Sequence, residues 1–163
     1  MNAAVLSLVI ALGLGCGEEQ EPDPRFASPE ATLDTLLASY GVEQMSQEEI
    51  QQHMREQGRF QLRDEQTYRL CFDDYDGPQS EGLAGFVFGT VAAAKDELRI
   101  NHVQGNVHVF PSSERNDRYV VLVERDGEFK ISLRESVPPS IRRTLLGQYE
   151  RIRSRNQRAG AAE

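Results

Sequence analysis

The chain is poor in cysteine, tryptophan and basic residues. It has two cysteines and no tryptophan among 163 residues, and 18 bases against 26 acids give it a formal net charge of −8. Two cysteines allow no more than one disulfide, so a disulfide-rich secreted scaffold is excluded. Binding to nucleic acid needs Lys and Arg clustered over a broad face, so this charge balance argues against a nucleic-acid partner.

Long apolar runs are also missing. The mean hydropathy is −0.53, and the apolar run 3–14 has the length of a signal-peptide core but is too short to span a bilayer. A chain of this length has room for one core. We therefore expect one water-soluble domain that follows a targeting segment.

The end of that apolar run resembles the lipobox of bacterial lipoproteins, in which a small residue precedes a cysteine that receives diacylglycerol. Gly15 and Cys16 match this pattern, and Gly13 stands where the family usually has Leu. The resemblance implies that residues 1–15 are removed and that a lipid on Cys16 anchors the protein in the cell envelope, facing the periplasm. The alternative is a soluble protein with a buried N-terminal helix, but this helix would have nothing to pack against.

Lipidation of Cys16 would leave Cys71 unpaired. Neither His nor Lys is its neighbour in sequence, so we expect a buried, unreactive thiol. The domain boundaries follow from composition: a signal peptide (1–15), an acidic tether (16–27), an α+β domain (28–135) and a basic C-terminal helix with its tail (136–163). The tether is rich in acids and proline, which resist packing.

Capping signals predict two helices at the start of the domain. Ser28, Pro29 and Glu30 are typical of a helix start, and Gly41 is typical of a helix end. A capping box begins at Ser46, and a second helix is expected from there to about residue 58. Residues 60–62 and 67–72 alternate like short strands, whereas 63–66 could be helical.

Residues 83–94 are apolar throughout and predict a helix. Gly85 and Gly89 inside it each cost roughly 1 kcal/mol against alanine. We therefore expect their backbone to approach a sheet closely. A strand over 86–91 is the alternative reading.

From residue 97 the apolar period becomes two and predicts two hairpins. A Gly105-Asn106 turn would place Ile100, His102, Val107 and Val109 on one face. An Asp126-Gly127 turn would place Arg125 opposite Glu128, with Val120, Leu122, Phe129, Ile131 and Leu133 on one face. The final helix has an apolar stripe that we expect to dock on the domain, formed by Ile141, Leu145, Tyr149 and Ile152.

The element order and two short motifs, residues 28–31 and 127–131, resemble the nuclear-transport-factor-2-like fold. The resemblance covers roughly residues 28–135. It implies N-terminal helices on a curved antiparallel sheet around a cone-shaped pocket, with a C-terminal amphipathic helix added. Members use that pocket for binding, proton transfer or assembly, and the fold alone does not choose among these.

His102 and Glu124 are the candidate ligand-binding residues, because both fall on the expected core side of the sheet. His108 faces the other way, so no metal site is expected. His53 is interpreted as a helix-edge residue. Asp73, Asp74 and Asp76 lack the spacing of a calcium loop and suit a turn. No cofactor is implied.

The function expected from these features is a lipid-anchored binding or assembly module of the cell envelope, without catalysis. Its partners would be the membrane through Cys16, an envelope protein or a second copy of the chain. A small enzyme that uses the cone pocket is one alternative. The other is a membrane-surface adaptor that acts through Arg142, Arg143, Arg151, Arg153, Arg155 and Arg158.

Overall fold

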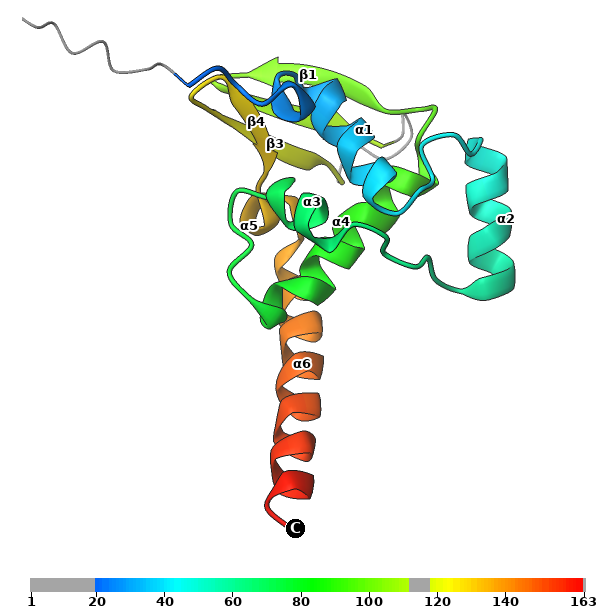
Figure 1. The fold of residues 1–163 in the computed structure, drawn as a ribbon, viewed down its shortest axis with the longest axis vertical. Coiled ribbons are helices and arrows are strands. Elements are labelled where there is room, and N and C mark those ends of the chain that lie inside the picture. The colour runs from blue at the N-terminus through cyan, green and yellow to red at the C-terminus, as the bar shows by residue number, and fades with distance from the viewer. Residues whose placement is uncertain (1–19, 112–117, 163) are drawn as a thin grey trace, which may run out of the picture.

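Helices packed on a four-stranded antiparallel sheet make up residues 20–111 and 118–162, which are the residues that the computed structural model describes (Figure 1). The predicted α+β class is confirmed. In chain order the elements are η1 (Pro24–Phe26), α1 (Pro29–Ser39), α2 (Gln47–Gln57), α3 (Glu65–Leu70), η2 (Pro78–Ser80), α4 (Glu81–Ala93), β1 (Arg99–Val103), β2 (Asn106–Phe110), β3 (Val120–Arg125), β4 (Glu128–Ile131), α5 (Leu133–Ser136) and α6 (Pro139–Gly160).

The first two helices begin where their capping signals predict. The Ser28 hydroxyl accepts a hydrogen bond from the Ala31 amide at 3.1 Å. At α2 the Ser46 hydroxyl and the Glu49 carboxylate each bond the other residue's backbone N–H, at 3.1 and 2.7 Å. These contacts satisfy amides that a helix start otherwise leaves unpaired. Local sequence therefore sets both starts.

The predicted strand over 67–72 is wrong, because residues 65–70 form helix α3. Its cap is Asp64, whose carboxylate accepts the Thr67 amide at 3.0 Å. Tyr68, Cys71 and Phe72 are buried, and this three-and-four spacing is helical rather than alternating. Only Phe72 keeps strand character, in a one-residue parallel bridge with Ile131.

Helix α4 confirms the helical reading of the apolar run, but its glycines do not touch a sheet. A Cβ added to Gly85 or to Gly89 would have no neighbour within 4 Å. The buried face consists instead of Leu83, Ala84, Val87, Phe88, Val91 and Ala92. The glycines thus lie on the open side of α4, and the expected close approach is wrong.

In the β1–β2 hairpin the predicted side chains share a face, but the turn lies at other residues than predicted. Its two turn residues are Gln104 and Gly105, at φ 47° and 86°, and Val103 pairs with Asn106. The predicted turn was one residue later, so the strand register differs from the prediction by two residues. A shift by two residues keeps each side chain on the same face of the sheet. Val107 and Val109 of that face are fully buried.

The second hairpin is confirmed, with Arg125 opposite Glu128 and Leu122 opposite Ile131. Strand β4 ends earlier than expected. The hydroxyl of Ser132 caps α5 by accepting the Glu135 amide at 3.3 Å, so Leu133 lies in a helical turn. Its side chain is buried all the same, 2 % exposed.

The packed part of the chain starts before the predicted boundary at residue 28. Phe26 of η1 is 1 % exposed and belongs to the main core cluster with residues of α1, α4 and the sheet. Residues 23–27 therefore belong to the fold, although composition placed them in the tether.

Candidate functional site

His102 and Glu124 lie on the core side of the sheet, as the predicted faces require, but at its rim. His102 pairs with Val107 on β2, and Glu124 pairs with Phe129 on β4. Both side chains are exposed, and β1 and β3 are separated by β2, about 10 Å. Strand pairing does not bring the two residues together, and their role in ligand binding stays a prediction.

The other histidines are held by aromatic stacking. His108 stacks on Tyr119 with ring centroids 4.9 Å apart, on the face opposite His102 as predicted. His53 stacks on Phe60 at 4.3 Å, and its Nε2 lies 3.1 Å from the Arg59 carbonyl oxygen. Across residues 20–111 and 118–162, no group of three or more His, Cys, Asp or Glu side chains is placed to hold a metal ion.

Cys71 has the buried position predicted for it. The side chain is fully buried and its thiol donates to the Thr67 carbonyl at 3.4 Å. Burial raises the pKa of the thiol to about 12. A neutral thiol is a poor nucleophile and a poor metal ligand.

The aspartates after Cys71 have structural roles, but Asp73 and Asp74 contact β3 and α5 rather than the turn that was predicted for them. Asp74 accepts the amides of Leu133 and Arg134 at 2.7 and 3.0 Å, at the start of α5. Asp73 pairs with Arg125 at 3.0 Å. These contacts use the carboxylates within the fold.

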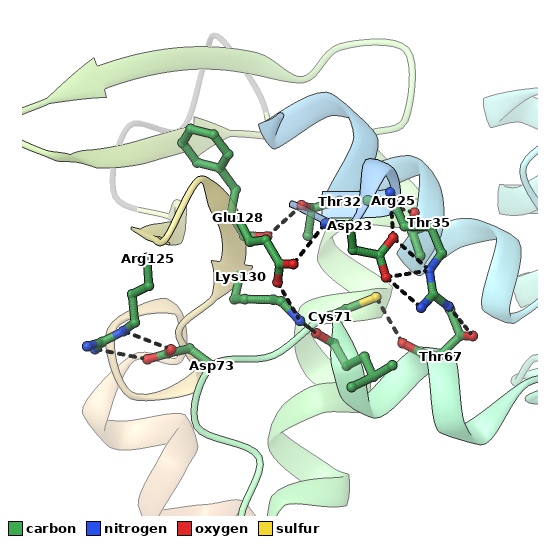
Figure 2. A network of polar contacts seen from close by, with 12 residues as sticks. Asp23, Arg25, Thr32, Thr35, Thr67, Cys71, Asp73, Arg125, Glu128 and Lys130 are labelled. Atoms are coloured by element: carbon green, nitrogen blue, oxygen red, sulfur yellow. Dashed lines mark hydrogen bonds and ion pairs between the residues drawn. The ribbon is translucent and has the colours of Figure 1, made fainter. Parts of the chain in front are cut away.

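A polar network fixes the N-terminal segment at the β3–β4 hairpin (Figure 2). The Asp23 amide donates to Glu128 at 2.9 Å, and Arg25 holds the Asp23 carboxylate through its Nε and Nη2 atoms. This contact with Arg25 keeps the pKa of Asp23 below its usual value. The segment therefore has one position on the fold.

Lys130 completes this network from β4. Its ammonium donates to the Leu70 carbonyl at 2.5 Å, lies 3.8 Å from the Glu128 carboxylate and stands 3.8 Å above the Phe26 ring. Pro22 lies so close to Gly127 that an added Cβ there would be 2.8 Å from its Cγ atom. Residues 22 and 23 thus lie beside the β3–β4 turn.

The first half of α6 docks on the domain. Ile141, Leu145 and Leu146 pack against the core cluster, and the Leu145 Cβ would lie 3.7 Å from a Cβ on Gly82. Arg142 donates to the Leu133 carbonyl at 2.9 Å. The predicted docking of Ile141 and Leu145 is confirmed.

The second half of α6 has no support from the domain. All residues from 150 to 162 are exposed, and Ile152 is 58 % exposed, so the prediction that Ile152 docks is wrong. We call residues 150–162 the arm. Figure 1 shows it extending away from the sheet, at the end of the molecule opposite the β3–β4 hairpin. A 22-residue helix is about 33 Å long.

The arm is basic, in contrast with the rest of the chain. It carries Arg151, Arg153, Arg155 and Arg158 against Glu150 alone, which gives 4 − 1 = +3. Only Arg153 has an acidic neighbour, Glu150 at 4.0 Å. The other three guanidinium groups have no partner among the described residues, so they are available to an acidic surface.

The fold and the two ends of the molecule define an α+β domain with a projecting basic helix. None of the described helices is long and apolar enough to cross a membrane. Comparison with protein-family models, with curated proteins and with solved structures finds no match for this chain.

Proposed function

We propose that the protein is a lipid-anchored module of the cell envelope, held at the membrane through Cys16, that binds an acidic partner protein through the arm and performs no catalysis. The observation that carries this proposal is the position of the arm, exposed along its full length at the end opposite the β3–β4 hairpin (Figure 1). The nuclear-transport-factor-2-like assignment is part of the same proposal.

The short connection to the membrane supports this orientation. Six residue steps separate Cys16 from Pro22, and a fully extended chain of that length spans at most about 22 Å. Pro22 lies against the β3–β4 turn, so an anchor on Cys16 keeps that end of the domain near the membrane. The arm then points away from the anchoring membrane. This arrangement favours a protein partner over the adaptor that would bind the same membrane through its arginines.

The positive charge of the arm favours an acidic partner over a second copy of the chain. Two copies of the arm, each at +3, would repel each other along their length, whereas an acidic helix or surface would pair with the guanidinium groups. The exposed Ile152 adds an apolar contact near the start of the arm.

Two experiments test this function. Intact mass spectrometry of the membrane-extracted protein should show the loss of residues 1–15 and a lipid on Cys16, and Cys16→Ser should abolish both changes. An unmodified full-length mass would contradict the proposed lipid anchor on Cys16.

The second experiment places a photo-crosslinking amino acid at position 152 of the lipidated protein in cells, with position 48 on α2 as the exposed control. Position 152 should give one protein adduct, and Arg151→Gln with Arg153→Gln and Arg155→Gln should remove it. Arg143→Gln, on the docked half of α6, should leave the adduct intact. An adduct with lipid in place of protein would favour the membrane-surface adaptor.

A further inference from the structure

A second surface stands apart from the arm, in a cleft of about 940 Å³ between the end of α1, helix α2 and the segment 59–63. A volume of this size is typical of small-molecule sites. The polar side chains that line it are those of Tyr40, His53, Gln57, Arg59, Gln61 and Arg63, beside an apolar floor.

The lining of this cleft contains no acid. All ten lining residues belong to the described part of the chain, and none of them is Asp or Glu, although acids outnumber bases by 26 to 18 over the whole protein. Arg59 and Arg63 give the cleft a net positive charge. Such a site attracts anions into an otherwise acidic protein.

Within the part of the chain that the structure describes, Arg59 and Arg63 have no acceptor for their guanidinium groups, in contrast with Arg25, Arg69 and Arg125. Arg25, Arg69 and Arg125 each pair with a carboxylate, at 2.7, 2.6 and 3.0 Å. Neither Arg59 nor Arg63 has an ion pair or a side-chain hydrogen bond within residues 20–111 and 118–162. Each guanidinium offers five N–H donors in a fork that matches phosphate or carboxylate oxygens.

Packing holds the segment that carries both arginines. Phe60 stacks on His53 and meets the Phe88 ring edge-on at 5.8 Å. The Arg63 and Asp64 amides both donate to the Ser39 carbonyl, at 2.9 and 3.1 Å. Phe60 and Leu62 are half-buried, whereas Arg59, Gln61 and Arg63 are exposed and line the cleft.

The end of α1 places the Arg63 guanidinium. A Cβ on Gly41, which follows α1, would overlap this guanidinium, and φ is +68° there, so glycine suits this position. The C-terminal end of a helix favours a nearby cation. Tyr40 also lines the cleft, and its ring stacks on Phe88 with centroids 3.8 Å apart.

We propose that this cleft binds a small soluble anion, whose phosphate or carboxylate oxygens pair with Arg59 and Arg63. A pair of arginines in one cleft suits a ligand with more than one charged group. The aromatic rings of Tyr40 and Phe60 contact its uncharged part. This site does not depend on the arm or on the lipid anchor.

Isothermal titration of the full chain in detergent tests the site, with pyrophosphate and citrate as probes in buffers matched for ionic strength by sodium chloride. At least one probe should bind saturably. Arg59→Gln and Arg63→Gln should each weaken binding tenfold or more, and the double variant should abolish it. Arg143→Gln, an exposed arginine on α6, should bind as the parent does. The probe that binds identifies the ligand as a phosphate or a carboxylate.

Two results would overturn the proposal: no saturable binding of either probe to the parent protein, or equal binding by the double variant. Thermal melts without ligand check that the variants are folded. If the double variant unfolds, Arg59→Lys with Arg63→Lys keeps the charge and removes the planar fork, and weaker binding by that folded variant supports the same conclusion. Parent-like binding by it would contradict the assigned pairing.

Discussion

At the residue scale, Phe26 marks the start of the fold. Its ring is 1 % exposed, and the ammonium of Lys130 lies above it. Phe26→Ala should lower the free energy of unfolding by about 3 to 5 kcal/mol, the usual cost of a buried phenylalanine. Pro24→Ala, an exposed neighbour in η1, should change it by about 1 kcal/mol or less. Equal, small effects in urea melts would mean that residues 23–27 are a tether after all.

Cys71 gives a prediction about pH. The thiol has its ordinary pKa of 9.0 in the unfolded chain, and burial in the fold raises this pKa to about 12. The stability that this difference contributes is fully present below pH 9, and it is lost as the pH rises toward 12. The free energy of unfolding of Cys71→Ala, measured by urea melts at each pH, should therefore decline less steeply over this range than that of the parent. The thiol should also resist native labelling at pH 8, and rapid labelling would contradict its burial.

At the element scale, the sequence predicted best where the signal was local. The caps at Ser28 and Ser46 act within one turn, so their residues suffice to set the helix starts. Segment 67–72 was misread because its alternation and its helical spacing use the same side chains. The cap at Asp64 favours the helix locally, whereas the bridge of Phe72 to Ile131, 59 residues away, is a contact that the local sequence does not contain.

Shortening an apolar side chain to alanine should affect stability differently in the two halves of α6. Leu145 is half-buried against the core and Ile152 is exposed. Leu145→Ala should lower the free energy of unfolding by about 2 kcal/mol, the low end for a core leucine because the site is only partly enclosed. Ile152→Ala should leave it within about 0.5 kcal/mol of the parent. Comparable losses in thermal melts would mean that the arm also packs on the domain.

Helix α4 offers a stabilising change. Gly85 and Gly89 are helical, and a Cβ at either would meet nothing. Gly85→Ala and Gly89→Ala should therefore each raise the free energy of unfolding by about 0.5 to 1 kcal/mol. Gly127→Ala is the control that should lower the free energy of unfolding, because φ is +80° there and Pro22 fills the space. Loss of stability in Gly85→Ala would show that something covers this face of α4.

At the scale of the whole molecule, the candidate surfaces depend on tertiary contacts that a sequence does not display. The stripe of α6 continues at helical spacing from Leu145 to Ile152, and nothing in that pattern indicates where the domain ends beneath it. Likewise, Tyr40, His53 and Arg63 come from separate segments, and they line one cleft because Phe60 packs between His53 and Phe88. The signal that the sequence offers for this cleft is the pair Arg59 and Arg63, four residues apart.

In the proposed arrangement, the lipid anchor and the arm lie at opposite ends of the molecule. An environment-sensitive fluorophore on Ile152→Cys, and separately on Glu21→Cys, tests it with lipidated protein in vesicles that contain a headgroup quencher. Cys71 is buried, so the added cysteine takes the label. We expect strong quenching of the fluorophore at position 21 and little at position 152. Equal quenching at both positions, or stronger quenching at 152, would contradict it.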